Sequence, residues 1–278
     1  MIKLIQIELY KIFRKPRTYI GFGAIAFIVI VVNLGFLFEG EQLLGFLLDS
    51  LKDKFLLSGN LINAYTMTFV ILNSLWIHLP ILISITAGDM ISGEANNGTF
   101  RLLLTRPISR SKLLAAKFFS AWIYTVLLLL FMISLSLIIG YLMFGVGDLI
   151  VIKSTISILS SDDTLWRFGY ATLYGILSMT TVTSLSFLLS SLSENSIGPI
   201  VGTFAIIVGL TIVSTLGYAL IGPAIPYLFT TYLPSWDLFF TMEFDVAKLT
   251  HAIYVNLAYT IAFITFTFYY FKNKDILS

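Results

Sequence analysis

The sequence of 278 residues contains no cysteine and only two histidines, and charged residues make up 12% of it. Without cysteine there is no disulfide framework, no thiolate zinc site and no cysteine nucleophile. Ordinary soluble domains carry about 25% charged residues, so this chain has too few charges for a surface that faces water. With 58% hydrophobic residues and a mean hydropathy of +0.93, the composition excludes a disordered chain, a basic nucleic-acid binder and a typical soluble enzyme. It predicts an integral membrane protein.

Catalytic motifs are also missing from the sequence. No phosphate-binding loop of the form G-x-x-x-x-G-K-[ST] occurs, so the chain alone is not expected to hydrolyse ATP by that mechanism. The two histidines are isolated, and His78 beside Pro80 is expected to be a hydrogen-bonded histidine at a helix kink. We therefore predict a non-catalytic chain with no metal site and no cofactor of its own.

Six apolar stretches are long enough to cross a membrane as helices, which needs about 20 residues each. We expect an all-α fold with one membrane domain over residues 1–278 and with spans at 19–38, 65–88, 116–144, 168–190, 197–221 and 251–271. Twelve of the 17 lysine and arginine residues fall on the side of the two termini. Because basic residues mark the inner side, the sequence predicts a multi-pass protein of the cell membrane with both termini cytoplasmic.

Residues 1–18 predict an amphipathic helix that lies in the cytoplasmic membrane interface. Apolar side chains such as Ile5 and Ile12 share one face, and Pro16 ends the pattern. Basic side chains are expected at the level of the lipid phosphates; these are Lys11, Arg14, Lys15 and Arg17. A plain topogenic segment before the first span is an equally good reading, and the two are compatible.

The outer segment 222–249 is too apolar for a free loop and too often interrupted by proline for a seventh span. We expect it to lie against the outer membrane surface or to re-enter shallowly. Its aromatic side chains suit an interfacial belt; they are Tyr227, Tyr232, Trp236 and Phe240.

The cytoplasmic segment 89–115 combines turn formers, charge and a short helical pattern. Gly98 permits a tight turn, Thr99 can cap a helix, and Pro107 prevents that helix from continuing. Four residues follow the spacing of one helical face, namely Phe100, Leu103, Leu104 and Pro107. A groove on another protein is a natural receptor for such an apolar face. The rival reading is a positively charged loop that only sets topology.

At these residues the chain resembles the permease subunits of ABC transporters of the ABC-2 exporter type. The pattern consists of Glu94, Gly98-Thr99, the run LLTRPISR over 103–110, and Lys117. The resemblance implies a coupling helix that fits a cleft on a separate ABC ATPase subunit. It also implies two copies of that ATPase, which bind ATP and Mg, and a second permease subunit in a homodimer. The residues it assigns to ATPase coupling are Glu94, Gly98, Thr99, Phe100, Arg101, Leu103, Leu104, Arg106, Pro107 and Arg110.

Two other functions stay open on the sequence alone. One is a secondary transporter or channel that works without an ATPase. Ion-coupled transport usually needs ionisable groups at membrane depth, and the middle of each predicted span lacks Asp, Glu, Lys and Arg. The other is an ABC complex that transmits force or a signal instead of moving a solute.

Overall fold

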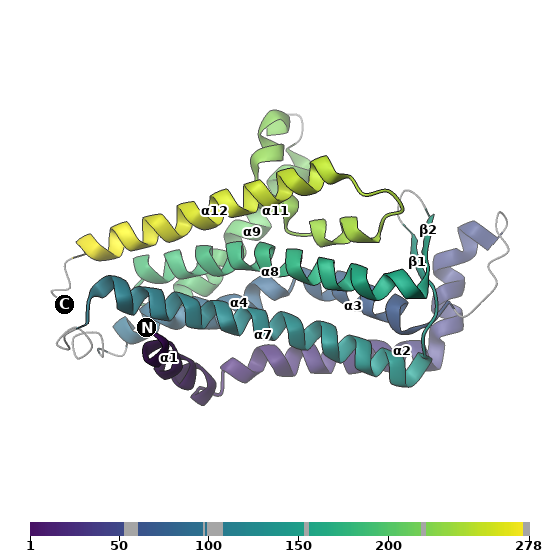
Figure 1. Cartoon of the computed structure of the whole chain (residues 1–278), viewed down its shortest axis with the longest axis horizontal. Coiled ribbons are helices and arrows are strands. Elements are labelled where there is room, and N and C mark those ends of the chain that lie inside the picture. The colour runs from purple at the N-terminus through teal and green to yellow at the C-terminus, as the bar shows by residue number, and fades with distance from the viewer. Residues whose placement is uncertain (53–60, 97, 99–107, 153–155, 218–220, 275–278) are drawn as a thin grey trace.

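The computed structural model of the protein describes residues 1–52, 61–96, 98, 108–152, 156–217 and 221–274. Long helices run side by side along the molecule (Figure 1). The longer described helices are α1 (Ile2–Arg14), α2 (Thr18–Lys52), α3 (Ala64–Trp76), α4 (Leu79–Ala87), α5 (Asp89–Asn96), α7 (Arg110–Phe144), α8 (Ser161–Leu192), α9 (Ile197–Leu216) and α12 (Val246–Asn273). The shorter elements are β1 (Leu149–Ile152), β2 (Ile156–Leu159), η1 (Gly222–Tyr227), α11 (Phe229–Tyr232) and η2 (Ser235–Phe240).

Five of these helices are long and apolar enough to cross a membrane: α2 over Thr18–Gly40, α7, α8, α9 and α12. Helices α3 and α4 together make a sixth candidate span, which is bent by 57°. The predicted helical, multi-pass architecture is therefore confirmed, with five spans or with six if the bent pair is one span. α8 is the central helix, because its apolar window is 67% buried while that of α9 is 17% buried.

The second predicted span, 65–88, is broken near its middle. Pro80 lies in the first turn of α4, where a missing N–H is tolerated, and it cannot continue α3 without a clash. The ring of His78 at the break donates from Nδ1 to the carbonyl oxygen of Ser74, at 2.9 Å. The expected role of His78 as a hydrogen-bonded histidine at a kink is thus confirmed.

A small β-hairpin adds to the predicted all-α fold. Strands β1 and β2 pair antiparallel, with Leu149 opposite Leu159 and Ile152 opposite Ile156. Leu149 and Leu159 are buried, whereas Ile158, one residue earlier on β2, is exposed. This period of two is typical of a strand. The hairpin was not predicted from the sequence, because each strand has only four residues.

The outer segment after α9 packs into the bundle through its aromatic side chains. Trp236 and Phe240 are fully buried, and their rings lie 5.0 Å from Trp76 and 4.7 Å from Phe168, centroid to centroid. The indole Nε1 of Trp76 donates to the carbonyl oxygen of Leu233 at 2.9 Å. The predicted interfacial belt is therefore wrong for Tyr232, Trp236 and Phe240, which are buried, and only Tyr227 is exposed. Prolines divide the segment into short helices, which allows it to fold back onto the bundle.

Helix α1 and the C-terminal end of α12 lie at the same end of the bundle (Figure 1). Arg110, the first residue of α7, donates from Nη1 to the carbonyl oxygens of Lys272 and Lys274 at the end of α12. Lys274 in turn donates to the carbonyl oxygen of Ser191 near the end of α8, at 3.2 Å. Basic side chains at helix C-termini satisfy carbonyls that lack partners within the helix. The hydrogen bonds of these two cations link the ends of α7, α8 and α12.

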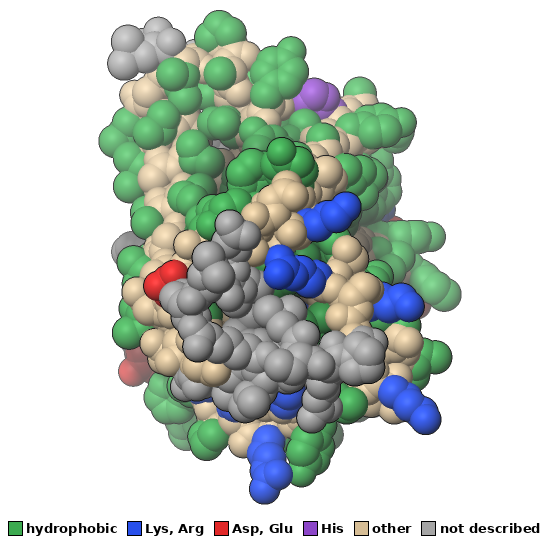
Figure 2. Space-filling model, turned by 90° about the vertical axis from the view of Figure 1, so that its left-hand side faces the viewer, with side chains coloured by type: hydrophobic (Ala, Val, Ile, Leu, Met, Phe, Trp, Pro, Cys, Tyr) green, Lys and Arg blue, Asp and Glu red, His purple; other side chains and the backbone are tan. Residues whose placement is uncertain are grey.

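We call this end the basic end. Figure 2 looks onto it and shows Lys and Arg side chains gathered there, with hydrophobic side chains on the flanks of the molecule. The described cations that define it are Lys3, Lys11, Arg14, Lys15, Arg17, Arg110, Lys112, Lys117, Lys272 and Lys274.

Candidate functional site

Helix α1 lies across the basic end and packs its apolar side against α7. Ile12 is buried there, and Ser120 of α7 donates to the carbonyl oxygen of Ile5 at 3.2 Å. The apolar face predicted for residues 1–18 is therefore real, but α7 covers it. Glu8 lies on the same buried side, since it follows Ile5 by three residues and precedes Ile12 by four. A carboxylate in that position needs a partner inside the protein.

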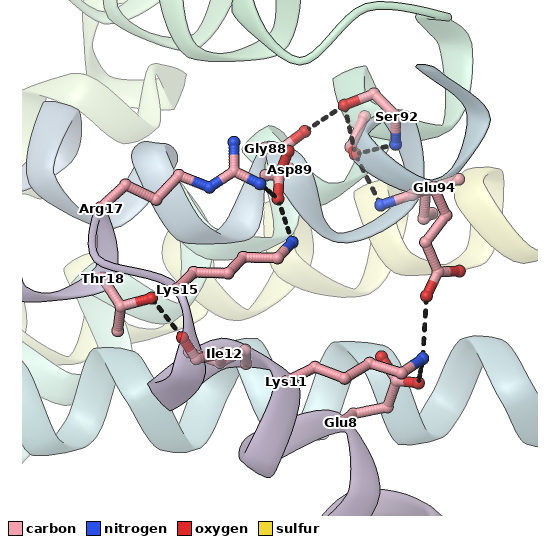
Figure 3. A network of polar contacts seen from close by, with 12 residues as sticks. Glu8, Lys11, Ile12, Lys15, Arg17, Thr18, Gly88, Asp89, Ser92 and Glu94 are labelled. Carbon is pink, nitrogen blue, oxygen red and sulfur yellow. Dashed lines mark hydrogen bonds and ion pairs between the residues drawn. The ribbon is translucent and has the colours of Figure 1, made fainter. Parts of the chain in front are cut away.

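The partner of Glu8 is Lys117, whose side chain is buried in α7. Lys117 is 1% exposed, and its Nζ lies 2.9 Å from Glu8 Oε2 and 2.7 Å from Glu94 Oε1. Lys11 contacts the same two carboxylates, at 2.7 Å from Glu8 Oε1 and 3.0 Å from Glu94 Oε1. Two cations and two carboxylates thus alternate where α1, α5 and α7 meet. Figure 3 shows the Glu8–Lys11–Glu94 part of this arrangement.

A second group of ion pairs forms around Asp89, the first residue of α5. Asp89 is 5% exposed, and its Oδ2 accepts from Lys15 Nζ at 2.7 Å and from the guanidinium of Arg17 (Figure 3). A negative charge in the first turn is also favoured by the dipole of α5. These contacts fasten the short linker between α1 and α2 to the start of α5.

Helix α5 is also held from the side of α8. The hydroxyl oxygen of Ser190 accepts from the backbone N–H groups of Ile91 and Ser92, at 3.0 Å each. These amides lie in the first turn of α5, where no carbonyl within the helix can reach them. A Cβ at Gly93 would overlap the carboxylate of Asp89, so a larger residue there would push that carboxylate away from its cations.

The ion pairs set the protonation of Glu8 and Lys11. Burial by itself raises the pKa of Glu8, but the charge of Lys117 and hydrogen bonds from Lys11 and Lys117 outweigh it and lower that pKa below 4.5. Burial lowers the pKa of Lys11, and the hydrogen bond to Glu8 and the charge of Glu94 outweigh that effect and raise it above 10.5. Both groups are charged at neutral pH.

The attachment of α1 should therefore withstand a wide range of pH. The contribution of Glu8 is complete above 4.5 and is lost as the pH falls through its lowered folded-state pKa. The contribution of Lys11 is complete below 10.5 and is lost as the pH rises through its raised pKa. A spin label on a single cysteine at Gln6→Cys is expected to keep constant mobility around neutral pH and to become more mobile only in acid, as the pH falls through the lowered pKa of Glu8. A transition centred near neutral pH would contradict these ion pairs.

The residues predicted to contact an ATPase fall into two groups. Glu94 lies in the ion-pair cluster, Gly98 has a φ of +66°, as expected for a glycine at a tight turn, and Arg110 joins α7 to α12. Ser109 caps α7, as its side chain accepts from the backbone N–H of Lys112 at 3.4 Å. The other predicted contacts lie outside the described residues; they are Thr99, Phe100, Arg101, Leu103, Leu104, Arg106 and Pro107.

The four cations predicted at the lipid phosphates differ in their contacts. Lys11, Lys15 and Arg17 pair with carboxylates, and Arg14 lies on the ring of Tyr10. Glu8, Asp89 and Ser190 were not predicted as members of this site, and Lys117 was predicted only as part of the family pattern, without its carboxylate partners. A signal for Glu8 was present, since a lone acid on the apolar face of an amphipathic helix indicates a buried partner.

These elements define a multi-pass α-helical membrane protein with a cluster of buried ion pairs at one end. Within the described residues no group of three or more His, Cys, Asp or Glu could hold a metal ion. The chain belongs to the family described as "Protein of unknown function (DUF2705)", which matches residues 25–277.

The chain is also similar to one curated protein, whose name states no activity. It is the "Uncharacterized protein YhcI" of Bacillus subtilis (strain 168), and it is 36% identical over 63 residues. That match covers 23% of this chain and 20% of the relative, so the chain aligns with only about a fifth of the relative's length.

Proposed function

We propose that the chain is the membrane-spanning permease subunit of an ATP-driven ABC transporter of the ABC-2 exporter type. Two such chains, as a homodimer, would work with two copies of a separate ATPase subunit, which binds ATP and Mg²⁺. The proposal is supported by the pattern from Glu94 to Lys117 and by the lack of a phosphate-binding loop in the 278-residue sequence.

The observation that carries the proposal is that ion pairs and hydrogen bonds fix both helices bordering the segment 97–107 to their neighbours. Helix α5 ends at Asn96 and is tied to α1, α7 and α8, while α7 begins at Arg110 and is tied to α12. A push on the segment would therefore move several helices together. Breaking a buried ion pair costs several kcal/mol, so rigid-body motion is the easier response.

The bent helix pair offers a place where such motion can be absorbed. α5 follows α4 directly after Gly88, and α4 meets α3 at the 57° break near His78. Residues at the ends of helices commonly serve as hinges in switching proteins. In the proposed cycle, closure of the ATPase dimer moves α4 and α5 with the rest of the basic end and alters access to the route between the two permeases.

The proposal places the basic end in the cytoplasm of the cell, because positive charge marks the inner side of a membrane. The alternative function, a secondary transporter or channel without an ATPase, has less support. Such proteins bind their coupling ions near the middle of the membrane. Among the described residues the buried Asp, Glu and Lys side chains are Glu8, Asp89 and Lys117, all at the basic end.

A single cysteine at each end of the bundle tests this proposal, because the natural chain has none. Asn96→Cys lies on an exposed position at the end of α5, and Ser160→Cys lies on an exposed position before α8, at the opposite end. We expect a thiol-linked photocrosslinker at Asn96→Cys to capture a protein that binds ATP and carries the phosphate-loop motif. We expect none from Ser160→Cys, and a thiol reagent that cannot cross the membrane should reach only Ser160→Cys in intact cells. Capture of no such ATPase at Asn96→Cys, or equal capture at both positions, counts against the proposal.

A further inference from the structure

The side of α1 that faces away from α7 carries a second surface that the ion-pair cluster does not use. Lys3, Gln6, Ile7 and Tyr10 line an open groove there, with a volume of about 390 Å³. Ile7 is 51% and Tyr10 is 64% exposed. The one acidic residue of α1, Glu8, is buried on the other side. This face therefore combines exposed apolar surface with positive charge alone.

Arg14 completes one end of this face. Its Nη1 donates to the hydroxyl oxygen of Tyr10 at 3.1 Å, and its guanidinium carbon lies 5.7 Å from the centre of the Tyr10 ring. The guanidinium has five N–H donors, so most of them remain available. A planar donor set of this kind matches the oxygens of a phosphate group, and a tyrosine ring suits the boundary between apolar and wet surroundings.

The face adjoins exposed aromatic and apolar surface on α2. Phe13 and Tyr19 meet edge to face at 6.5 Å between ring centres, and the Tyr19 hydroxyl donates to the carbonyl oxygen of Phe13 at 2.9 Å. Tyr19 is exposed, as are Ile20 and Phe27 in the following turns of the span. In a membrane this side of α2 lies against lipid tails. The outer face of α1 thus lies where the headgroups of the same lipids begin.

We propose that the outer face of α1 binds the headgroups of anionic phospholipids in the leaflet at the basic end. Arg14 with Tyr10 holds one phosphate, and Lys3 holds another, since eleven residues of helix separate their Cα atoms by about 16 Å. The apolar surface of Ile7 between them accepts the upper part of a lipid tail. Lys11, Lys15 and Arg17, which the sequence predicts at the phosphates, already pair with carboxylates.

Fluorescence quenching by labelled lipids tests this site on the full chain. A bimane dye on a single cysteine at Gln6→Cys reports on the groove, in vesicles of phosphatidylcholine that contain either brominated phosphatidylglycerol or brominated phosphatidylcholine. We expect clearly stronger quenching by the anionic lipid. Replacing Lys3 and Arg14 with glutamine should lower the preference for the anionic lipid by about fivefold for each charge removed. The matched control, with Lys112 and Lys272 replaced by glutamine, removes two exposed cations of the basic end outside α1 and should keep the preference.

Three results would overturn the proposal. These are equal quenching by the two lipids, an unchanged preference in the Lys3/Arg14 variant, and protection of the dye from an aqueous quencher by an ATPase subunit in place of lipid. Native mass spectrometry of the unlabelled natural chain does not depend on the folding of any variant. In that measurement the chain should retain phosphatidylglycerol in preference to phosphatidylcholine. The lipid site does not depend on the permease function, so either proposal can fail without the other.

Discussion

Replacing Lys117 with methionine is expected to lower the free energy of unfolding by about 3–5 kcal/mol, because the carboxylates of Glu8 and Glu94 lose their buried cation and share only the half-exposed Lys11. Lys117 Nζ is within 3 Å of both Glu8 and Glu94, and water does not reach it. The measurement is thermal unfolding of the purified protein in detergent. Lys112→Met is the matched control, since Lys112 is exposed on the same helix and its loss should cost little.

A combined variant separates lost charge pairing from lost packing. When Lys117→Met is joined to Glu8→Gln and Glu94→Gln, no buried carboxylate of this group is left unpaired, so most of the lost stability should return. If the Lys117→Met variant were as stable as the Lys112→Met variant, the ion pairs would not be what holds α1, α5 and α7 together.

Replacing Leu103 with aspartate is expected to abolish the functional contact with the ATPase. In the proposed coupling helix Leu103 lies on the apolar face with Phe100 and Leu104. A carboxylate there would lose its water on entering an apolar cleft, which costs several kcal/mol. The expected result is either loss of the ATPase during purification or ATP hydrolysis that no longer depends on transport.

The control for Leu103→Asp is the same change one residue earlier. Leu102 follows Phe100 by two residues, about 200° around a helix, so in the proposed coupling helix its side chain would lie opposite the apolar face. Leu102→Asp should leave ATPase binding and coupling nearly unchanged. Equal loss in both variants would mean that a negative charge anywhere in the segment is disruptive, and full activity of Leu103→Asp would remove the basis for the coupling helix.

The membrane helices were predictable because lipid imposes a simple demand on sequence. A helix that crosses hydrocarbon needs a long apolar run, and the runs found in the sequence correspond to α2, α7, α8, α9, α12 and the bent pair. Their ends were harder to predict. α7 begins at Arg110 instead of residue 116, and α8 begins at Ser161 instead of residue 168, because helices continue past the membrane where charged residues face water.

The partners of the charged residues could not be predicted in the same way. Lys11, Lys15 and Arg17 look alike in sequence, and their pairing with Glu94 or Asp89 depends on how α1 turns against α5 and α7. Trp236 is a similar case, because its burial beside Trp76 depends on how the outer segment folds over α3. Residues far apart in the chain meet at both places, and periodicity carries only local information.

Purification of the tagged chain from its native membranes in mild detergent measures the proposed partnership itself. We predict a stoichiometric second subunit with the phosphate-loop motif, whose ATP hydrolysis drives flux when the complex is placed in vesicles. A stable chain without that subunit, which transports in vesicles in the absence of ATP, would contradict the permease assignment.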